Sequence, residues 1–94
     1  MRYRLRVPEP VAALIRGLHP EIKRKVRAGL EAILDEPAVG KPLRDELEGL
    51  RSLRVGRLRV VYRVGKGRVI DVISVGPRRS IYEETFRLVR RDER

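Results

Sequence analysis

Hydrophobic residues recur along this chain with two periods, and each period predicts one kind of element. Residues 3–7 alternate apolar and charged side chains and stop at a proline, which predicts a short strand. Residues 9–18 and 20–36 carry apolar side chains three and four positions apart, which predicts two helices separated by a break at His19-Pro20. So short a break favours an antiparallel helical hairpin.

The second half of the chain returns to the two-residue period of strands. Residues 37–42 have the composition of a loop, and residues 43–47 that of a single helical turn. Three strands are predicted after them, over residues 50–55, 58–64 and 68–75, with Gly76-Pro77 ending the last one. The turn at residues 65–67 can contain two or three residues, so the sequence does not determine the register of the final strand.

A two-residue hairpin joins the first two of these strands. Gly56-Arg57 places glycine at the position of the turn that needs a positive φ. This register puts Val55 opposite Leu58 and Arg54 opposite Arg59.

A last helix is predicted from about Ser80 to Val89, because Ser80 and Glu83 form a capping box. The predicted order is therefore β-α-α-β-β-β-α. We expect an α+β fold in which the helices, with the N-terminal hairpin among them, pack on one face of a mainly antiparallel sheet. Residues 1–94 are long enough for one domain and too short for two.

Charge changes this picture more than composition does. The chain has a formal net charge of +10, and residues 50–79 contain nine Lys or Arg against the single acid Asp71. In the hairpin, arginines occupy one face and apolar residues the other. Because Arg54 and Arg59 oppose each other with like charge, we expect an anionic partner such as nucleic acid to cover this face. The alternative is a set of solvated surface charges.

Other chemistry finds little support in the residue types. The chain has no cysteine, which removes thiol catalysis and thiolate metal sites, and no apolar run of membrane-spanning length. His19 is interpreted as a helix-end residue and the acidic turn around Asp45 as a salt-bridging cluster, so no metal or cofactor is expected. Tyr62 shares the apolar face and is assigned to the core. Tyr82, near the start of the last helix, either joins the arginines or packs helix against sheet.

The chain resembles the RelE toxins of the RelE/ParE superfamily of toxin–antitoxin modules. Residues 53–62 (LRVGRLRVVY) and 72–82 (VISVGPRRSIY) carry the resemblance, which extends over nearly the whole length. It implies a ribosome-dependent endoribonuclease that cleaves messenger RNA in the ribosomal A site. The similar ParE toxins share the fold but act on DNA gyrase.

The resemblance also implies site residues. The catalytic set consists of Arg54, Arg59, Arg78 and Tyr82. The RNA-binding set consists of Arg51, Ser52, Arg57, Arg63 and Arg79. Cleavage would proceed by attack of a ribose 2′-oxygen on the neighbouring phosphate, without metal or cofactor.

One position departs from the best-known RelE pattern. Ser52 stands where that pattern has a lysine implicated as general base, and serine is a weak base. Arg51 is adjacent and would substitute if the strand shifted or if the family tolerated the change. This departure favours a toxin that binds gyrase or another target without chemistry, whereas Arg59, Arg78 and Tyr82 occurring together favour the ribonuclease. An inactive relative that only binds its antitoxin is a third alternative.

The implied partners follow from the same resemblance. They are a RelB-like antitoxin, the ribosomal A site with its message, and operator DNA only through the antitoxin. No membrane partner is expected, and we expect a soluble protein that stays in the cytoplasm.

Overall fold

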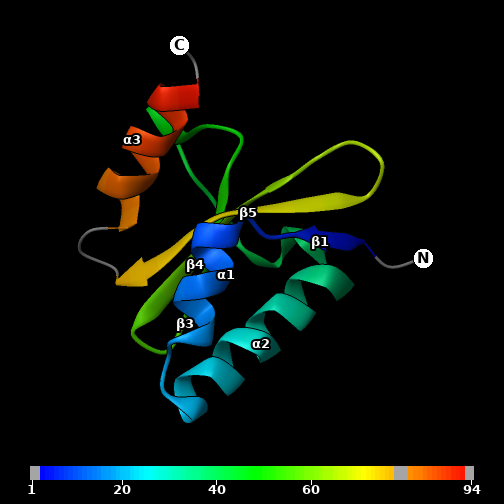
Figure 1. The fold of residues 1–94 in the computed structure, drawn as a ribbon. Coiled ribbons are helices and arrows are strands. Elements are labelled where there is room, and N and C mark those ends of the chain that lie inside the picture. The colour runs from blue at the N-terminus through cyan, green and yellow to red at the C-terminus, as the bar shows by residue number, and fades with distance from the viewer. Residues whose placement is uncertain (1–2, 78–80, 93–94) are drawn as a thin grey trace.

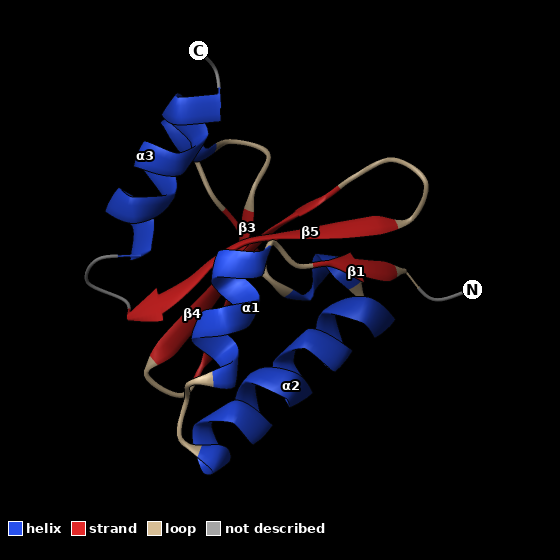
Figure 2. Cartoon of the chain, in the orientation of Figure 1, coloured by secondary structure: helices blue, strands red, loops and turns tan. Residues whose placement is uncertain are grey.

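The computed structural model describes residues 3–77 and 81–92, which form a five-stranded sheet with three α-helices (Figures 1 and 2). The strands are β1 (Arg4–Arg6), β2 (Lys41–Pro42), β3 (Arg51–Val55), β4 (Leu58–Val64) and β5 (Val69–Pro77). The helices are α1 (Glu9–Arg16), α2 (Pro20–Asp35) and α3 (Ile81–Asp92), with the 3-10 turns η1 (Pro37–Val39) and η2 (Asp45–Leu47) between α2 and β3.

The helical hairpin begins and ends where the prolines predict. Proline lies in the first turn of both α1 and α2, where its missing N–H removes no hydrogen bond. The Nδ1 atom of His19 accepts a hydrogen bond from the backbone N–H of Glu21 at 3.2 Å and so caps α2. His19 is therefore a helix-end residue, as the sequence predicts.

The sheet has the strand order β1-β5-β4-β3-β2, with β1 parallel to β5 and the other pairs antiparallel. The predicted β3–β4 hairpin is confirmed: Val55 pairs with Leu58, Arg54 pairs with Arg59, and Gly56 has a φ of +61°. The open register of the last strand is settled by the pairing of Val64 with Ile70. That strand extends through Pro77, slightly beyond its predicted end.

Residues 37–42 are more ordered than the predicted loop, because they form η1 and the edge strand β2. Tyr62 is fully buried, as predicted, and its hydroxyl donates to the Pro37 carbonyl at 2.7 Å and accepts from the Gly40 N–H at 2.9 Å. A Cβ at residue 40 would lie 2.5 Å from that hydroxyl, so only glycine fits. Burial raises the pKa of the Tyr62 hydroxyl, which keeps it neutral and able to donate.

Hydrophobic residues pack on both faces of the sheet, which corrects the expectation of helices on one face. The hairpin α1–α2 covers a core containing Val26, Ile33 and Tyr62, and so confirms the predicted placement of the N-terminal helices. Helix α3 covers a second cluster around Val61 and Ile81 on the opposite face. Successive residues of β4 point to opposite faces, so α3 lies on the face that carries Arg59. The arginine face is therefore partly covered by the chain itself.

The edge strand β1 is tied to the sheet by an ion pair that makes stability depend on pH. The Asp71 carboxylate accepts from Nε of Arg6 at 2.5 Å and lies 4.0 Å from the Arg63 guanidinium. The hydrogen bond from Arg6 lowers the pKa of Asp71 below its ordinary value of 3.8. The pKa of Asp71 is therefore lower in the folded than in the unfolded protein. The ion pair stabilises the fold fully at pH values above the ordinary pKa of 3.8, and this contribution is lost as the pH falls through the folded-state pKa.

We expect Asp71→Asn to be modestly less stable than the wild type at neutral pH. The difference should shrink to nothing in acid, where the wild-type carboxyl is protonated as well. Urea unfolding of both proteins from about pH 7 to about pH 2 measures it. A stability difference that stays constant over this range would contradict the role of the ion pair.

Candidate functional site

The candidate site lies on the α3 side of the β3–β4 hairpin. Ser52 and Arg54 are two residues apart on β3, so their side chains leave the same face of the sheet. Their partners across the hairpin are Val61 and Arg59. The first turn of α3 brings Tyr82 over this face, where it joins the apolar cluster beneath α3.

Ser52 is the point at which three of the predicted site residues meet. Its side chain is buried, and its hydroxyl oxygen accepts a hydrogen bond from Nη1 of Arg59 at 3.4 Å and another from the Tyr82 hydroxyl at 3.3 Å. Both distances exceed the usual 2.7–3.2 Å range, so the two contacts are weak. A ligand oxygen can therefore displace them at little cost.

Arg59 also carries a buried donor. Its Nε atom has no hydrogen-bond partner among the side chains that the structure describes, which in α3 leave out those of residues 83, 84, 88 and 90–92. A buried donor without a partner costs free energy, and the cost is greater when the group is charged. An anionic oxygen entering beside Ser52 would satisfy this donor. The site can therefore accept an anion that the described side chains do not supply.

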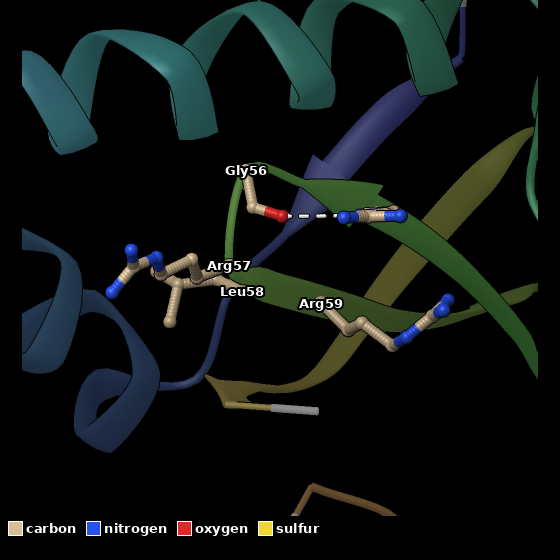
Figure 3. A pocket seen from close by; sticks show the side chains of 5 residues that line it. Gly56, Arg57, Leu58 and Arg59 are labelled. Carbon is tan, nitrogen blue, oxygen red and sulfur yellow. Dashed lines mark hydrogen bonds between the residues drawn. The ribbon is translucent and has the colours of Figure 1, made fainter. Parts of the chain in front are cut away.

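Arg54 and Arg57 lie at the tip of the hairpin. They line a shallow pocket of about 210 Å³ together with Gly56, Leu58 and Arg59 (Figure 3). Nε of Arg54 donates to the Gly56 carbonyl at 3.2 Å, so this side chain folds back over its own turn. In Figure 3 the side chains of Arg57 and Arg59 point away from each other. Arg54 and Arg59 thus border the pocket from neighbouring strands, and Arg57 extends the positive charge outward.

Arg51 and Arg63 do not join this cluster. The guanidinium of Arg51 donates from Nη1 to the carbonyls of Gly40 at 2.7 Å and Ala38 at 3.3 Å, which holds η1 and β2 against β3. The observed register leaves β3 unshifted, so Arg51 does not take the place of Ser52. Arg63 is exposed and faces Asp71.

Two predicted site residues, Arg78 and Arg79, lie outside the described residues, as does Ser80, the predicted cap of the last helix. The described part of the chain ends before them at Pro77, which pairs with Leu58 next to the hairpin turn. In the sequence, Arg78 directly follows this partner of Leu58, and Leu58 is one of the residues that line the pocket.

Within the residues that the structure describes, no group of three or more His, Cys, Asp or Glu side chains is placed to hold a metal ion. No helix there is both long and apolar enough to cross a membrane.

The sequence predicted no role for two hydroxyl residues near the candidate site. Ser74 and Thr85 are buried where α3 meets β5, and their side-chain oxygens are 2.6 Å apart. The signal for Thr85 is its position four residues after Ile81, on the face of α3 that packs on the sheet. Ser74 gives no such signal, because a β-bulge sets the direction of its side chain.

Known proteins resemble this chain in sequence and in fold. The model of a family described as the ParE toxin of the parDE type II toxin–antitoxin system matches residues 12–82. A Mycobacterium tuberculosis protein named Toxin RelE is 42% identical over 52 residues, which cover 53% of this chain and only 54% of that relative.

Two solved structures illustrate the likeness in fold. The toxin–antitoxin complex RelBE2 of M. tuberculosis contains a chain with a TM-score of 0.72 and 31% identity, covering 83% of this chain and 100% of that one. A mutant of the E. coli toxin RelE in the free state has a TM-score of 0.74 and 27% identity, covering 97% and 98% of the two chains.

Proposed function

Because this chain belongs to the ParE toxin family of type II toxin–antitoxin systems and is a RelE-type toxin, we propose that it is a ribosome-dependent messenger-RNA endoribonuclease. The observation that carries the proposal is the cluster of Arg59, Ser52 and Tyr82, in which Arg59 holds a buried Nε without a partner. Gyrase inhibition by binding alone needs no such donor. Residues 1–94 act as one toxin domain.

The reaction begins when a ribose 2′-oxygen attacks the adjacent phosphorus. The new O2′–P bond forms as the P–O5′ bond breaks, leaving a 2′,3′-cyclic phosphate and a 5′-hydroxyl. The 2′-hydroxyl gives up its proton, and the departing 5′-oxygen gains one. Negative charge builds on the phosphate oxygens in between, so cations and proton carriers accelerate the reaction.

The site residues fit these tasks as follows. Arg59 stabilises the charge on the phosphate through Nε and its Nη atoms, since guanidinium binds phosphate oxygens in pairs. Arg54 gives up its contact with Gly56 and positions the phosphate. Tyr82 stacks on or orients the nucleotide. Arg78 serves the leaving oxygen, and Arg57, Arg63 and Arg79 bind the RNA backbone.

Arg51 and Ser52 take other parts than direct RNA binding. The two hydrogen bonds of Arg51 to Gly40 and Ala38 support a structural role beneath the site. Ser52 lies between Arg59 and Tyr82, but its hydroxyl is too weak a base to take the 2′-proton. A site without a strong base depends on the ribosome to align the message, so this protein is nearly idle on free RNA.

An antitoxin is the partner that controls this activity. The similar M. tuberculosis chain is part of a toxin–antitoxin complex, and a cationic site bordered by Arg54 and Arg57 fits an acidic or amphipathic segment. The protein acts in the cytoplasm, where the ribosomal A site presents the message, and it reaches operator DNA only through the antitoxin.

Gyrase inhibition is the second candidate function. It is favoured by the description of the matching family as ParE toxins and by serine at residue 52. An inactive relative that only binds the antitoxin is the third.

Induction of the protein in bacteria without an antitoxin separates these candidates. We expect growth arrest within minutes, new messenger-RNA ends inside translated regions and unchanged plasmid supercoiling. Growth arrest with intact messages and altered plasmid supercoiling would contradict the ribonuclease function and favour gyrase inhibition. Growth that continues with intact messages would leave the inactive relative.

A further inference from the structure

A stripe of side chains along helix α3 packs on the sheet. Ile81, Thr85 and Val89 are spaced four residues apart, so they share a face of the helix. Ile81 and Thr85 are fully buried, and Val89 packs against the same cluster. Thr85 thus places a hydroxyl group in the middle of an otherwise apolar stripe between α3 and the sheet.

The hydroxyl of Thr85 belongs to a chain of hydrogen bonds whose direction can be assigned. Thr85 Oγ1 donates to the backbone carbonyl of Ile81 at 2.6 Å, which uses its only proton. The contact of 2.6 Å between Ser74 and Thr85 must therefore be a donation from Ser74 Oγ to Thr85 Oγ1. The chain runs from the sheet into the first turn of α3 and satisfies both buried hydroxyls.

The β-bulge in β5 makes this contact possible. Val61 pairs with Ser74 and Tyr62 with Val72, so Ile73 is the extra residue. Ile73 packs in the cluster beneath α3, and the next residue, Ser74, also reaches α3. Without the bulge, strict alternation would send Ser74 to the opposite face.

This chain of bonds selects one position for α3. Sliding or turning the helix would keep the bond from Thr85 to the Ile81 carbonyl, which lies within α3, but it would leave the buried hydroxyl of Ser74 without its acceptor. Purely apolar contacts, in contrast, tolerate small shifts. The carbonyl that ends the chain belongs to Ile81, and Tyr82 is the next residue. The contact of Tyr82 with Ser52, at 3.3 Å, is too long to hold the helix by itself.

We propose that Ser74 and Thr85 are positioning residues that fix α3 on the sheet and so hold Tyr82 over Ser52 and Arg59. Only one consequence rests on the proposed function, namely that message cleavage depends on Ser74 and Thr85. Neither residue touches the message.

Three variants test this role. Thr85→Val removes the Thr85 hydroxyl at nearly constant side-chain shape and leaves the Ser74 hydroxyl without its acceptor. Ser74→Ala removes the hydroxyl that donates to Thr85. The double variant removes both hydroxyls and leaves no buried hydroxyl unsatisfied, so its overall stability should return close to that of the wild type. Thr85→Ser keeps the hydroxyl and serves as the matched control.

We expect amide hydrogen exchange in α3 to accelerate about tenfold in Thr85→Val, with the central strands unchanged. The nuclear Overhauser contacts between the Tyr82 ring and residue 52 should weaken in both single variants and remain weak in the double variant. They should persist in Thr85→Ser. Unchanged Tyr82 contacts in Thr85→Val and in the double variant would overturn the proposal.

Cleavage on programmed ribosomes adds the functional readout. We expect the single-turnover rate to fall about tenfold in the double variant although its stability has returned, with ribosome affinity unchanged. A wild-type rate in the double variant would show that the hydroxyls only stabilise. If the wild type itself does not cleave messages, the proposed function is wrong. The nuclear Overhauser contacts of Tyr82 still test whether Ser74 and Thr85 position α3.

Discussion

Arg59→Ala should slow ribosome-dependent cleavage by about two to three orders of magnitude, because it removes the principal donor to the charge on the phosphate. The variant should fold normally and be as stable as the wild type or slightly more so. The substitution removes a buried Nε without a partner and the opposition of like charges between Arg54 and Arg59. Single-turnover cleavage and thermal unfolding measure the two effects.

Two matched variants distinguish this role from a general loss of charge. Arg59→Lys keeps the charge but loses the planar fork, so it should recover only a small part of the rate. Arg24→Ala removes one exposed positive charge from α2, on the other side of the sheet, and should cleave normally. The role of Arg59 is wrong if Arg59→Ala cleaves at the wild-type rate.

Ser52→Lys should have the second-largest effect, an increase in the cleavage rate of about tenfold or more. The side chain of residue 52 points between Arg59 and Tyr82 in a buried position, so a lysine there would reach the reacting phosphate. Burial and the neighbouring guanidinium would lower the pKa of the new amine, which would then accept the 2′-hydroxyl proton. Single-turnover rates across pH should rise as this amine loses its proton.

Ser52→Met is the control for this gain, because methionine has similar length without an amine. It should cleave no faster than the wild type. Equal rates in the lysine and methionine variants would mean that residue 52 is not the position of a missing base. Arg51→Ala should reduce stability, since Arg51 secures η1 and β2.

The hairpin at the centre of the site was predictable because its determinants are local. Gly56-Arg57 defines a two-residue turn, and the period of two then assigns Ser52, Arg54 and Arg59 to one face. The same logic predicted both N-terminal helices, whose prolines and apolar spacing act within a few residues. Sequence therefore sufficed wherever one turn or one cap decides the structure.

Contacts between distant residues decided the rest. Strand β2 depends on the Tyr62 hydroxyl, which binds residues 37 and 40 across the fold. The contact of Ser74 with α3 depends on the bulge at Ile73, which neither the alternation nor the turn residues reveal. The sequence marked Ser52 only as a departure from a family pattern, and its contacts with Arg59 and Tyr82 come from the structure.

The most direct measurement is primer extension on a defined message, with purified protein, in the presence and absence of ribosomes stalled with an open A site. Ribonuclease activity predicts cuts at the A-site codon, ending in a 2′,3′-cyclic phosphate and a 5′-hydroxyl, only when ribosomes are present and only with Arg59 intact. Intact messages on stalled ribosomes at saturating protein would contradict it.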